Sequence, residues 1–290
     1  MRADDTAVVL LGAARSGTKF LRSVIAAPDG FCATPFDCNH IWRLGNARAV
    51  HDELDPQSIS ERDARDIRAA LWKLACPSPS ERVGKVLVEK TVSNALRPVF
   101  VERVLPGARY VVLLRDGRDV VESTFRMWMS PPDGPGLRRK LAALPARALP
   151  YALWYGANMV AGRLRGRSVG IWGVRYRGIQ RDLQNLTLPE VCAYQWRHCV
   201  QRSLEFASGL PPDRCVIVRY ESLIADPNAL TPVCRMLNLD ASASARVHHA
   251  LSSGIQRQPS RWDTTFDAST RERILDIIGR LQAQLGYPVA

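Results

Sequence analysis

Two glycines and two cations near the start of the chain have a spacing that suits phosphate binding. The stretch Thr6-Ala-Val-Val-Leu-Leu-Gly-Ala-Ala-Arg-Ser-Gly-Thr-Lys-Phe-Leu21 begins as a short apolar run and passes into a loop rich in small residues. Gly12 and Gly17 let the backbone approach an anion, and the amides of the helix expected next would point at it. The two glycines have Walker A spacing, but the order Thr18-Lys19-Phe20 leaves no hydroxyl after the lysine for Mg²⁺. The loop therefore predicts a phosphate cradle that works without magnesium, with an ordinary strand-to-helix turn as the simpler interpretation.

A second candidate phosphate contact follows another apolar run, in the stretch Leu114-Arg-Asp-Gly-Arg-Asp-Val-Val-Glu-Ser123. Ligands of open α/β sheets bind at the carboxyl ends of the strands, and Arg115 stands at such an end. Its forked guanidinium and the hydroxyl of Ser123 suit one further phosphate. Asp116 and Asp119 can fix the turn through side-chain bonds to the backbone, which is also the simplest role of the whole motif. Together with the first loop, this motif predicts a ligand with phosphates at both ends.

Apolar runs and helical periodicity supply the elements that must position these residues. Short buried strands are expected at 6–11, 85–89, 109–114 and 215–220, and helices near 18–27, 60–74, 93–104, 119–129 and 189–208. Ser269 to Glu272 has the form of a capping box before a last helix, and residues 30–60 look irregular. Continuously apolar strands that alternate with helices imply a parallel sheet covered on both faces. The prediction is a single α/β domain over residues 1–290, with a central parallel sheet flanked by helices and a P-loop-like phosphate-binding turn.

The net charge of +12 is concentrated in one part of the chain. No acidic residue lies between Asp133 and Asp182, where ten Arg and Lys residues mix with aromatic residues such as Trp154 and Trp172. Such a segment suits a nucleic acid, an anionic glycan or a lipid headgroup surface, and a solvated face is an equally good interpretation. We interpret residues 130–185 as a basic insert that forms a lid on the acceptor side.

Other features of the composition place the chain in the cytoplasm. No run approaches the roughly 18 apolar residues of a membrane span, and Asp4 and Asp5 before the first apolar run argue against a signal peptide. The seven cysteines are scattered and lack metal-type spacing, so they predict reduced thiols and no metal site. The expected localisation is cytoplasmic, with peripheral contact to an anionic membrane as an option.

The two phosphate motifs together resemble the sulfotransferases that use 3′-phosphoadenosine 5′-phosphosulfate (PAPS). Gly12 to Leu21 is similar to that family's 5′-phosphosulfate loop, and Leu113 to Ser123 to its 3′-phosphate motif. Val88-Glu-Lys90-Thr and Val218-Arg-Tyr220-Glu-Ser-Leu are similar to segments of the tyrosylprotein and bacterial carbohydrate branch. Further likenesses reach Tyr287, so the resemblance covers the whole chain except the basic insert.

The resemblance implies a co-substrate, PAPS, a product, 3′,5′-ADP, and no metal. The residues that it implies for nucleotide binding are Arg15, Ser16, Gly17, Thr18, Lys19 and Phe20 at the 5′ end, Arg115 and Ser123 at the 3′-phosphate, and Tyr220, Ser253 and Arg261 at the purine. Arg15 stands where many members have a lysine. Because an arginine stays charged, Arg15 would stabilise negative charge on the leaving phosphate together with Lys90, and would not donate a proton. Lys19 replaces the family's usual Thr or Ser and would supply a phosphate contact through its ammonium, with a solvated helix lysine as the simpler role.

The acceptor hydroxyl must also lose a proton, and the segment from Ala33 to His40 is comparable to the family segment that carries a glutamate base. That glutamate falls near Pro35, so the match is inexact. Asp37 is the first candidate for the base and His40 the second, because histidine is poised near neutral pH. Glu89 is a third candidate, with an ion pair to the adjacent lysine as its simpler role.

The predicted function is transfer of the sulfuryl group from PAPS to a hydroxyl of an acceptor by in-line displacement. The favoured acceptor is a saccharide or lipid-linked saccharide, while a peptide tyrosine or a small phenol stays open, and no specific nucleic acid is expected. A P-loop nucleotide-dependent kinase is the first alternative, since the run that ends at Asp116 looks like a Walker B strand. A non-enzymatic basic module that binds anions or membranes is the second, and it predicts steeply salt-dependent binding.

Overall fold

A five-stranded sheet with the order β2-β3-β1-β4-β5 forms the centre of the protein. The computed structural model describes residues 7–130, 170–254 and 259–289, together with six residues between 153 and 164. The strands are β1 (Ala7–Leu11), β2 (Phe31–Ala33), β3 (Val86–Glu89), β4 (Arg109–Leu114) and β5 (Cys215–Arg219). Every neighbouring pair is parallel, which confirms the predicted α/β class with a central parallel sheet.

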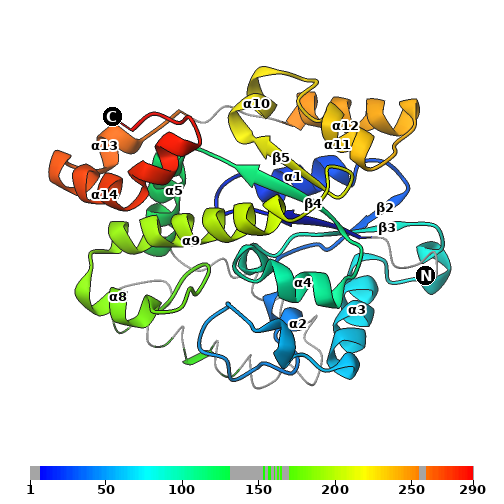
Figure 1. The fold of residues 1–290 in the computed structure, drawn as a ribbon, viewed down its shortest axis with the longest axis horizontal. Coiled ribbons are helices and arrows are strands. Elements are labelled where there is room, and N and C mark those ends of the chain that lie inside the picture. Colours follow the sequence, from blue (N-terminus) through cyan, green and yellow to red (C-terminus); the bar gives the residue numbers. More distant parts are fainter. Residues whose placement is uncertain are drawn as a thin grey trace.

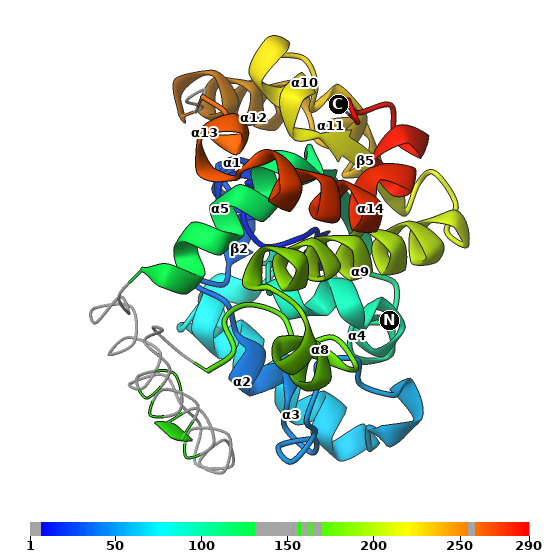
Figure 2. The ribbon, with the colours of Figure 1, turned by 90° about the vertical axis from the view of Figure 1, so that its left-hand side faces the viewer.

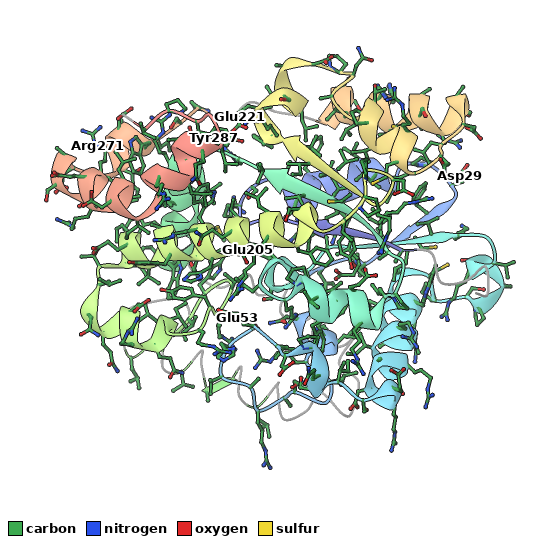
Figure 3. The ribbon with its side chains drawn as sticks, viewed as in Figure 1. Asp29, Glu53, Glu205, Glu221, Arg271 and Tyr287 are labelled. Atoms are coloured by element: carbon green, nitrogen blue, oxygen red, sulfur yellow. The ribbon has the colours of Figure 1, made fainter. Side chains whose placement is uncertain are left out.

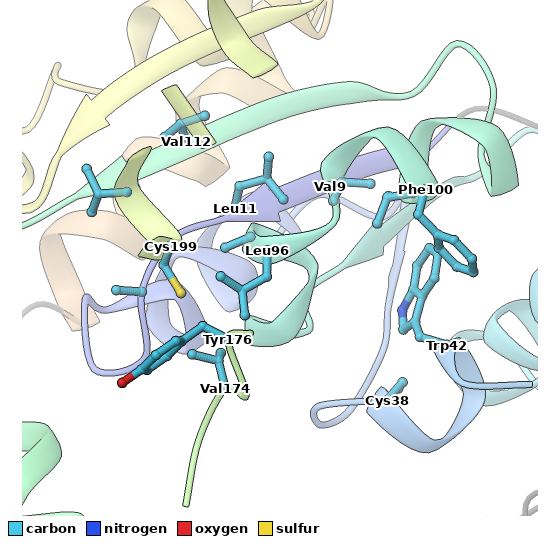
Figure 4. Close-up of a cluster of buried hydrophobic side chains, with 14 of the residues drawn as sticks. Val9, Leu11, Cys38, Trp42, Leu96, Phe100, Val112, Val174, Tyr176 and Cys199 are labelled. Carbon is cyan, nitrogen blue, oxygen red and sulfur yellow. The ribbon is translucent and has the colours of Figure 1, made fainter. Parts of the chain in front are cut away.

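Each face of the sheet has its own apolar core, because successive side chains of a strand point to opposite faces. In β1, Val9 belongs to the larger core and Val8 to the smaller one. The larger core also holds Trp42 and Tyr176; in the same cluster Figure 4 shows Trp42 beside Phe100 and Tyr176 beside Val174. All seven cysteines are free thiols and six of them are buried, so they pack as small apolar side chains.

Helices cover both faces of the sheet (Figures 1 and 2). The smaller core is covered by α1 (Thr18–Ile25), α10 (Tyr220–Ala225), α11 (Thr231–Met236) and α12 (Ala241–Gly254). The larger core is covered by α2 (Asn39–Trp42), α3 (Glu61–Ala75), α4 (Pro98–Val104), α5 (Gly117–Met129), α8 (Ile179–Asn185), α9 (Leu188–Ser208), α13 (Trp262–Thr265) and α14 (Ala268–Gln284). Three short 3₁₀ turns complete the described elements, at Pro56–Ser58, Pro79–Arg82 and Val92–Leu96.

Three local expectations differ from the structure. The segment 30–60, expected to be irregular, contributes the edge strand β2 and the single turn α2, both too short for a periodic signal. The helix expected over 93–104 is a 3₁₀ turn followed by α4, because a residue before proline avoids helical geometry and Arg97 has φ −139°. The cap of α14 is Asp267, whose carboxylate accepts the amide hydrogen of Thr270, and not the expected capping box.

The parallel arrangement brings the carboxyl ends of all five strands to one edge of the sheet. The strand order then fixes the sequence of groups along that edge. The segment after β2 comes first, followed by the residues after β3, the glycine-rich loop after β1, the turn after β4 and the start of α10 after β5. The two phosphate motifs, which follow β1 and β4, are therefore neighbours.

Candidate functional site

The glycine-rich loop after β1 is shaped by two close backbone approaches. Gly12 lies against β4, where a side-chain carbon would stand 2.8 Å from the carbonyl oxygen of Leu113. Gly17 has φ +97° and begins α1, and a side-chain carbon there would stand 2.7 Å from the Tyr220 ring. The hydroxyl of Ser16 closes the loop by donating to the carbonyl oxygen of Ala13 at 2.8 Å. No acidic residue occupies the first turn of α1, so its amide hydrogens remain suited to an anion.

Arg15 joins the loop to the second phosphate motif. Its Nε donates to the Ser123 hydroxyl at 3.0 Å, and the Arg115 guanidinium donates to the Arg15 carbonyl oxygen at 3.2 Å. Arg15 has φ +70°, an uncommon conformation for a residue with a side chain. Partial burial lowers the pKa of Arg15, and the nearby Arg126 and Arg115 lower it further, yet an arginine remains a cation at neutral pH.

The turn that presents Arg115 is held from three later parts of the chain. Trp196 of α9 donates its indole N–H to the Arg115 carbonyl oxygen at 3.3 Å. Glu221 of α10 accepts the Asp116 amide hydrogen at 2.9 Å. Gln282 of α14 accepts the Gly117 amide hydrogen, also at 2.9 Å. These bonds fix the backbone on which the guanidinium is carried.

A further contact secures Glu221 itself, since its other carboxylate oxygen accepts the Tyr287 hydroxyl at 2.9 Å. Figure 3 shows Glu221 and Tyr287 side by side, where α10 meets the C-terminal end of α14. The carboxylate of Glu221 is therefore committed to holding the turn.

A cavity of about 510 Å³ opens beside this turn. It is lined by Arg115, Asp119, Tyr220, Glu221, Ile224, Pro259 and Ser260. The Arg115 guanidinium lies 4.4 Å from the centre of the Tyr220 ring, and Asp119 pairs with Arg115 at 3.3 Å while accepting the Ser260 hydroxyl at 2.6 Å. A concave site of this size, with a cation stacked on an aromatic ring, suits a flat ligand that carries a phosphate.

On the other side of the glycine-rich loop, Asp37 and Lys90 form a two-pronged ion pair. The Lys90 ammonium lies 3.1 Å and 3.0 Å from the two carboxylate oxygens of Asp37, and the Val92 amide hydrogen is donated to one of them at 2.8 Å. Lys90 is buried, whereas the Asp37 side chain is 37% exposed. Asp37 is thus fixed in direction and still open to a ligand.

The other two candidate bases are enclosed. Glu89 is fully buried and accepts hydrogen bonds from Trp42, Thr91 and Asn94. The expected ion pair between Glu89 and Lys90 is not formed, because adjacent residues of an extended chain point to opposite sides and Lys90 pairs with Asp37. His40 is only 5% exposed and lies on α2.

Arg22 connects the two halves of the site. It is buried on α1 and donates to the Pro35 carbonyl oxygen at 3.1 Å. Burial lowers the pKa of Arg22, whereas the charges of Asp37 and Glu89 raise it. The first helix therefore carries a cation beside the candidate base as well as the amides of the phosphate loop.

Some predicted nucleotide contacts lie outside the cavity. The Ser253 hydroxyl donates to the His249 carbonyl oxygen within α12, and Arg261 is exposed at the start of α13. Phe20 packs against Gly254 of α12, where a side-chain carbon would stand 2.8 Å from the ring. Lys19 is exposed on the first turn of α1. Of the predicted lid, Trp154 and most residues from 131 to 169 fall outside the described residues. Its described end, from 170 to 185, packs into the larger core through Val174, Tyr176 and Ile179, with Trp172 against it.

The sequence interpretation missed several residues that shape the site. Asp119 was expected only to fix its own turn, and its contact with Ser260, 141 positions away, was missed. Gln282 reaches the turn from 165 positions away, and such separations leave no local signal. Arg22 carried a recoverable signal, because a charged residue on the apolar stripe of a short helix needs a partner.

One protein family has a sequence model that matches this chain. The sequence model described as the sulfotransferase family matches residues 7–187. Among solved structures, the sulfotransferase STF9 from Mycobacterium avium aligns with a TM-score of 0.52 and 13% identity over 97% of this chain and 77% of that one. The sulfotransferase domain from the curacin biosynthetic pathway aligns with a TM-score of 0.47 and 17% identity over 98% of both chains.

A third solved structure, mouse sulfotransferase SULT7A1 complexed with PAP, gives a TM-score of 0.49 and 12% identity over 97% of this chain and 85% of that one. A comparison with curated protein sequences gave no match.

Proposed function

The chain belongs to the sulfotransferase family, and on that premise we propose that it transfers the sulfuryl group of PAPS to an acceptor hydroxyl and releases 3′,5′-ADP. Family membership favours this reaction over the kinase and over the non-enzymatic anion-binding module. Sulfuryl transfer, like phosphoryl transfer, depends mainly on positioning and on neutralising charge. The arrangement at the carboxyl edge of the sheet suits both tasks.

The observation that carries the proposal is the contact between the two phosphate motifs. Arg15 of the loop donates to Ser123, and Arg115 donates back to the Arg15 carbonyl oxygen, so two cations and a hydroxyl share one surface. A nucleotide with a 5′-phosphosulfate over the loop would place its 3′-phosphate near Arg115 and Ser123. The Tyr220 ring beside Arg115 supports a purine in the cavity, a better-placed contact than Ser253 or Arg261.

Charge in the transition state would collect on the oxygen that bridges phosphorus and sulfur. The loop amides of residues 16–19 and the Arg15 guanidinium stand ready to stabilise it, and Lys90 supplies a further cation from the neighbouring strand. Asp37 is the favoured base, because it is the most open of the three candidates and its direction is fixed by Lys90 and the Val92 amide. His40 and Glu89 are too enclosed to meet an acceptor.

The acceptor that we propose is a saccharide or lipid-linked saccharide with an anionic character. This rests on the charge of +12 and on the run without acidic residues from 134 to 181. Among the described helices none has the length and apolar character to cross a bilayer. The same basic run supports peripheral contact with an anionic membrane, and we propose a cytoplasmic location. Orientation of the acceptor would come from the basic segment.

Calorimetric binding without magnesium tests the donor. Wild type should bind 3′,5′-ADP more tightly than 5′-ADP or Mg-ATP. Arg115→Ala should weaken 3′,5′-ADP about 10- to 100-fold, the value of a charge-assisted contact, and erase the preference for the 3′-phosphate. Arg103→Ala, which removes the same charge from an exposed position on α4, is the matched control and should bind as wild type does. Equal affinity of wild type for 3′,5′-ADP and 5′-ADP would refute the proposal.

A further inference from the structure

Glu89 is a fully buried acid near the candidate base, and nothing in the proposed reaction uses it directly. Its side chain is 0% exposed at the end of β3. One carboxylate oxygen accepts from the Trp42 indole at 3.1 Å and from the Thr91 hydroxyl at 2.6 Å, and the other accepts from the Asn94 amide at 2.9 Å. A buried carboxylate with three well-placed donors is satisfied in its ionised form, although none of the three is a cation.

The orientation of these partners fixes the direction of the hydrogen bonds. Thr91 receives the Cys38 amide hydrogen on its hydroxyl oxygen at 2.9 Å, so its own hydrogen is available for Glu89. Asn94 accepts from Arg97 through its carbonyl oxygen at 2.9 Å, so its NH₂ faces Glu89. The Glu89 carboxylate therefore accepts three hydrogen bonds, and none of these partners needs a hydrogen from it.

Two of these bonds reach the segment that carries Asp37. Through Thr91, Glu89 holds the backbone of Cys38, the residue directly after the candidate base. Through Trp42, it holds the end of α2, which closes the same segment. Both held residues are fully buried, so the backbone beside Asp37 is anchored from inside the protein.

Charge gives Glu89 a second effect on Asp37. Burial raises the pKa of Glu89, and the negative charge of Asp37 raises it further, whereas the three hydrogen bonds oppose the change. Such an interaction is reciprocal, so an ionised Glu89 makes Asp37 hold a proton more tightly. The cations Lys90 and Arg22 also act on Asp37, and they act in the opposite sense.

We propose that Glu89 is a positioning residue for the base: its hydrogen bonds to Thr91 and Trp42 fix the segment that carries Asp37, and its buried carboxylate places a second negative charge near the Asp37–Lys90 pair. This rests on the proposed role of Asp37.

The test separates charge from position. Carboxyl ¹³C NMR titration of Asp37, assigned with Asp37→Asn, is performed without donor or acceptor on wild type, Glu89→Gln and Thr91→Val. Glu89→Gln should lower the Asp37 midpoint by about one pH unit, the size expected for two like charges at short range. Thr91→Val removes the bond to the Cys38 backbone and one bond that favours ionised Glu89, so it should lower kcat about 10-fold, and Thr91→Ser should restore kcat.

The control is Glu102→Gln at the opposite edge of the sheet, where the carboxylate accepts the Tyr110 hydroxyl and pairs with Arg214. It should not move the Asp37 midpoint. Wild type alone gives a second measurement should Glu89→Gln fail to fold: the Asp37 signal must show an inflection where Glu89 itself titrates. An unmoved midpoint in Glu89→Gln, or no such inflection, overturns the inference. The NMR readouts need no nucleotide, so they stand apart from the 3′,5′-ADP test of the proposed function.

Discussion

Gly17 offers a direct test of how the phosphate loop is coupled to the donor cavity. Its backbone has φ +97°, and an alanine Cβ would lie 2.7 Å and 2.8 Å from two carbons of the Tyr220 ring. The left-handed conformation costs a residue with a side chain about 1–2 kcal/mol. Because the ring must also move, overpacking adds about 1–3 kcal/mol. Gly17→Ala should therefore lower the free energy of unfolding by about 2–5 kcal/mol.

The chain contains a matched control for the conformational part of this cost. Gly107 has φ +80°, and a side-chain carbon there meets nothing within 4 Å. Gly107→Ala should cost only the conformational term of about 1–2 kcal/mol. Urea unfolding of both variants isolates the contact with Tyr220, and in a Tyr220→Ala background the difference between them should vanish.

Ligand binding gives the functional half of the same test. Tyr220 stacks on Arg115 at 4.4 Å, so a displaced ring also displaces the guanidinium. Gly17→Ala should lose most of its affinity for 3′,5′-ADP in calorimetry, while Gly107→Ala should bind as wild type does. If Gly17→Ala and Gly107→Ala unfold at the same urea concentration, the coupling from Gly17 through Tyr220 to Arg115 is refuted.

Two further predictions concern buried charge and backbone strain. Burial alone would raise the pKa of Asp52, but the charges of Arg97, Arg175 and Arg43 outweigh burial and hold that pKa below its usual value. Ionised Asp52 therefore stabilises the folded protein. This contribution is fully present above the pKa of Asp52 in the unfolded chain and is lost as the pH falls through the lower pKa of the folded state. Asp52→Asn should cost about 3–5 kcal/mol near neutral pH and flatten the acid side of a plot of unfolding free energy against pH. Arg15 has φ +70°, so Arg15→Gly should be more stable to urea than Arg15→Ala by about 1 kcal/mol, although both should lose activity.

The parts of the site that could be predicted are those formed by one short, continuous stretch of sequence. The loop before Lys19 and the turn after Leu114 each combine an apolar strand with a polar end, so their positions follow from local pattern. The pairing of Lys90 was predicted wrongly, because adjacency in sequence suggested Glu89 as its partner. In an extended chain adjacent side chains diverge, and the true partner, Asp37, is 53 positions away.

The edge strand β2 shows a second limit of local pattern. It has three residues, Phe31–Ala33, and only the middle one is fully buried, so neither alternation nor a long apolar run reveals it. Its existence follows from the parallel partner β3, since register with Val86–Val88 supplies its hydrogen bonds. A strand stabilised mainly by its neighbour is visible only once the sheet is assembled.

The residues that hold the Arg115 turn come later in the chain than the two phosphate motifs. The family match spans 7–187 and contains both phosphate motifs, yet the bonds that hold the Arg115 turn come from Trp196, Glu221 and Gln282, beyond that range. An isolated turn of this kind would be one loop conformation among many, because fixing each backbone residue costs about 1–2 kcal/mol. The C-terminal third therefore holds the Arg115 turn in place and contributes Tyr220 to the cavity, whereas both phosphate motifs lie in the first half of the chain.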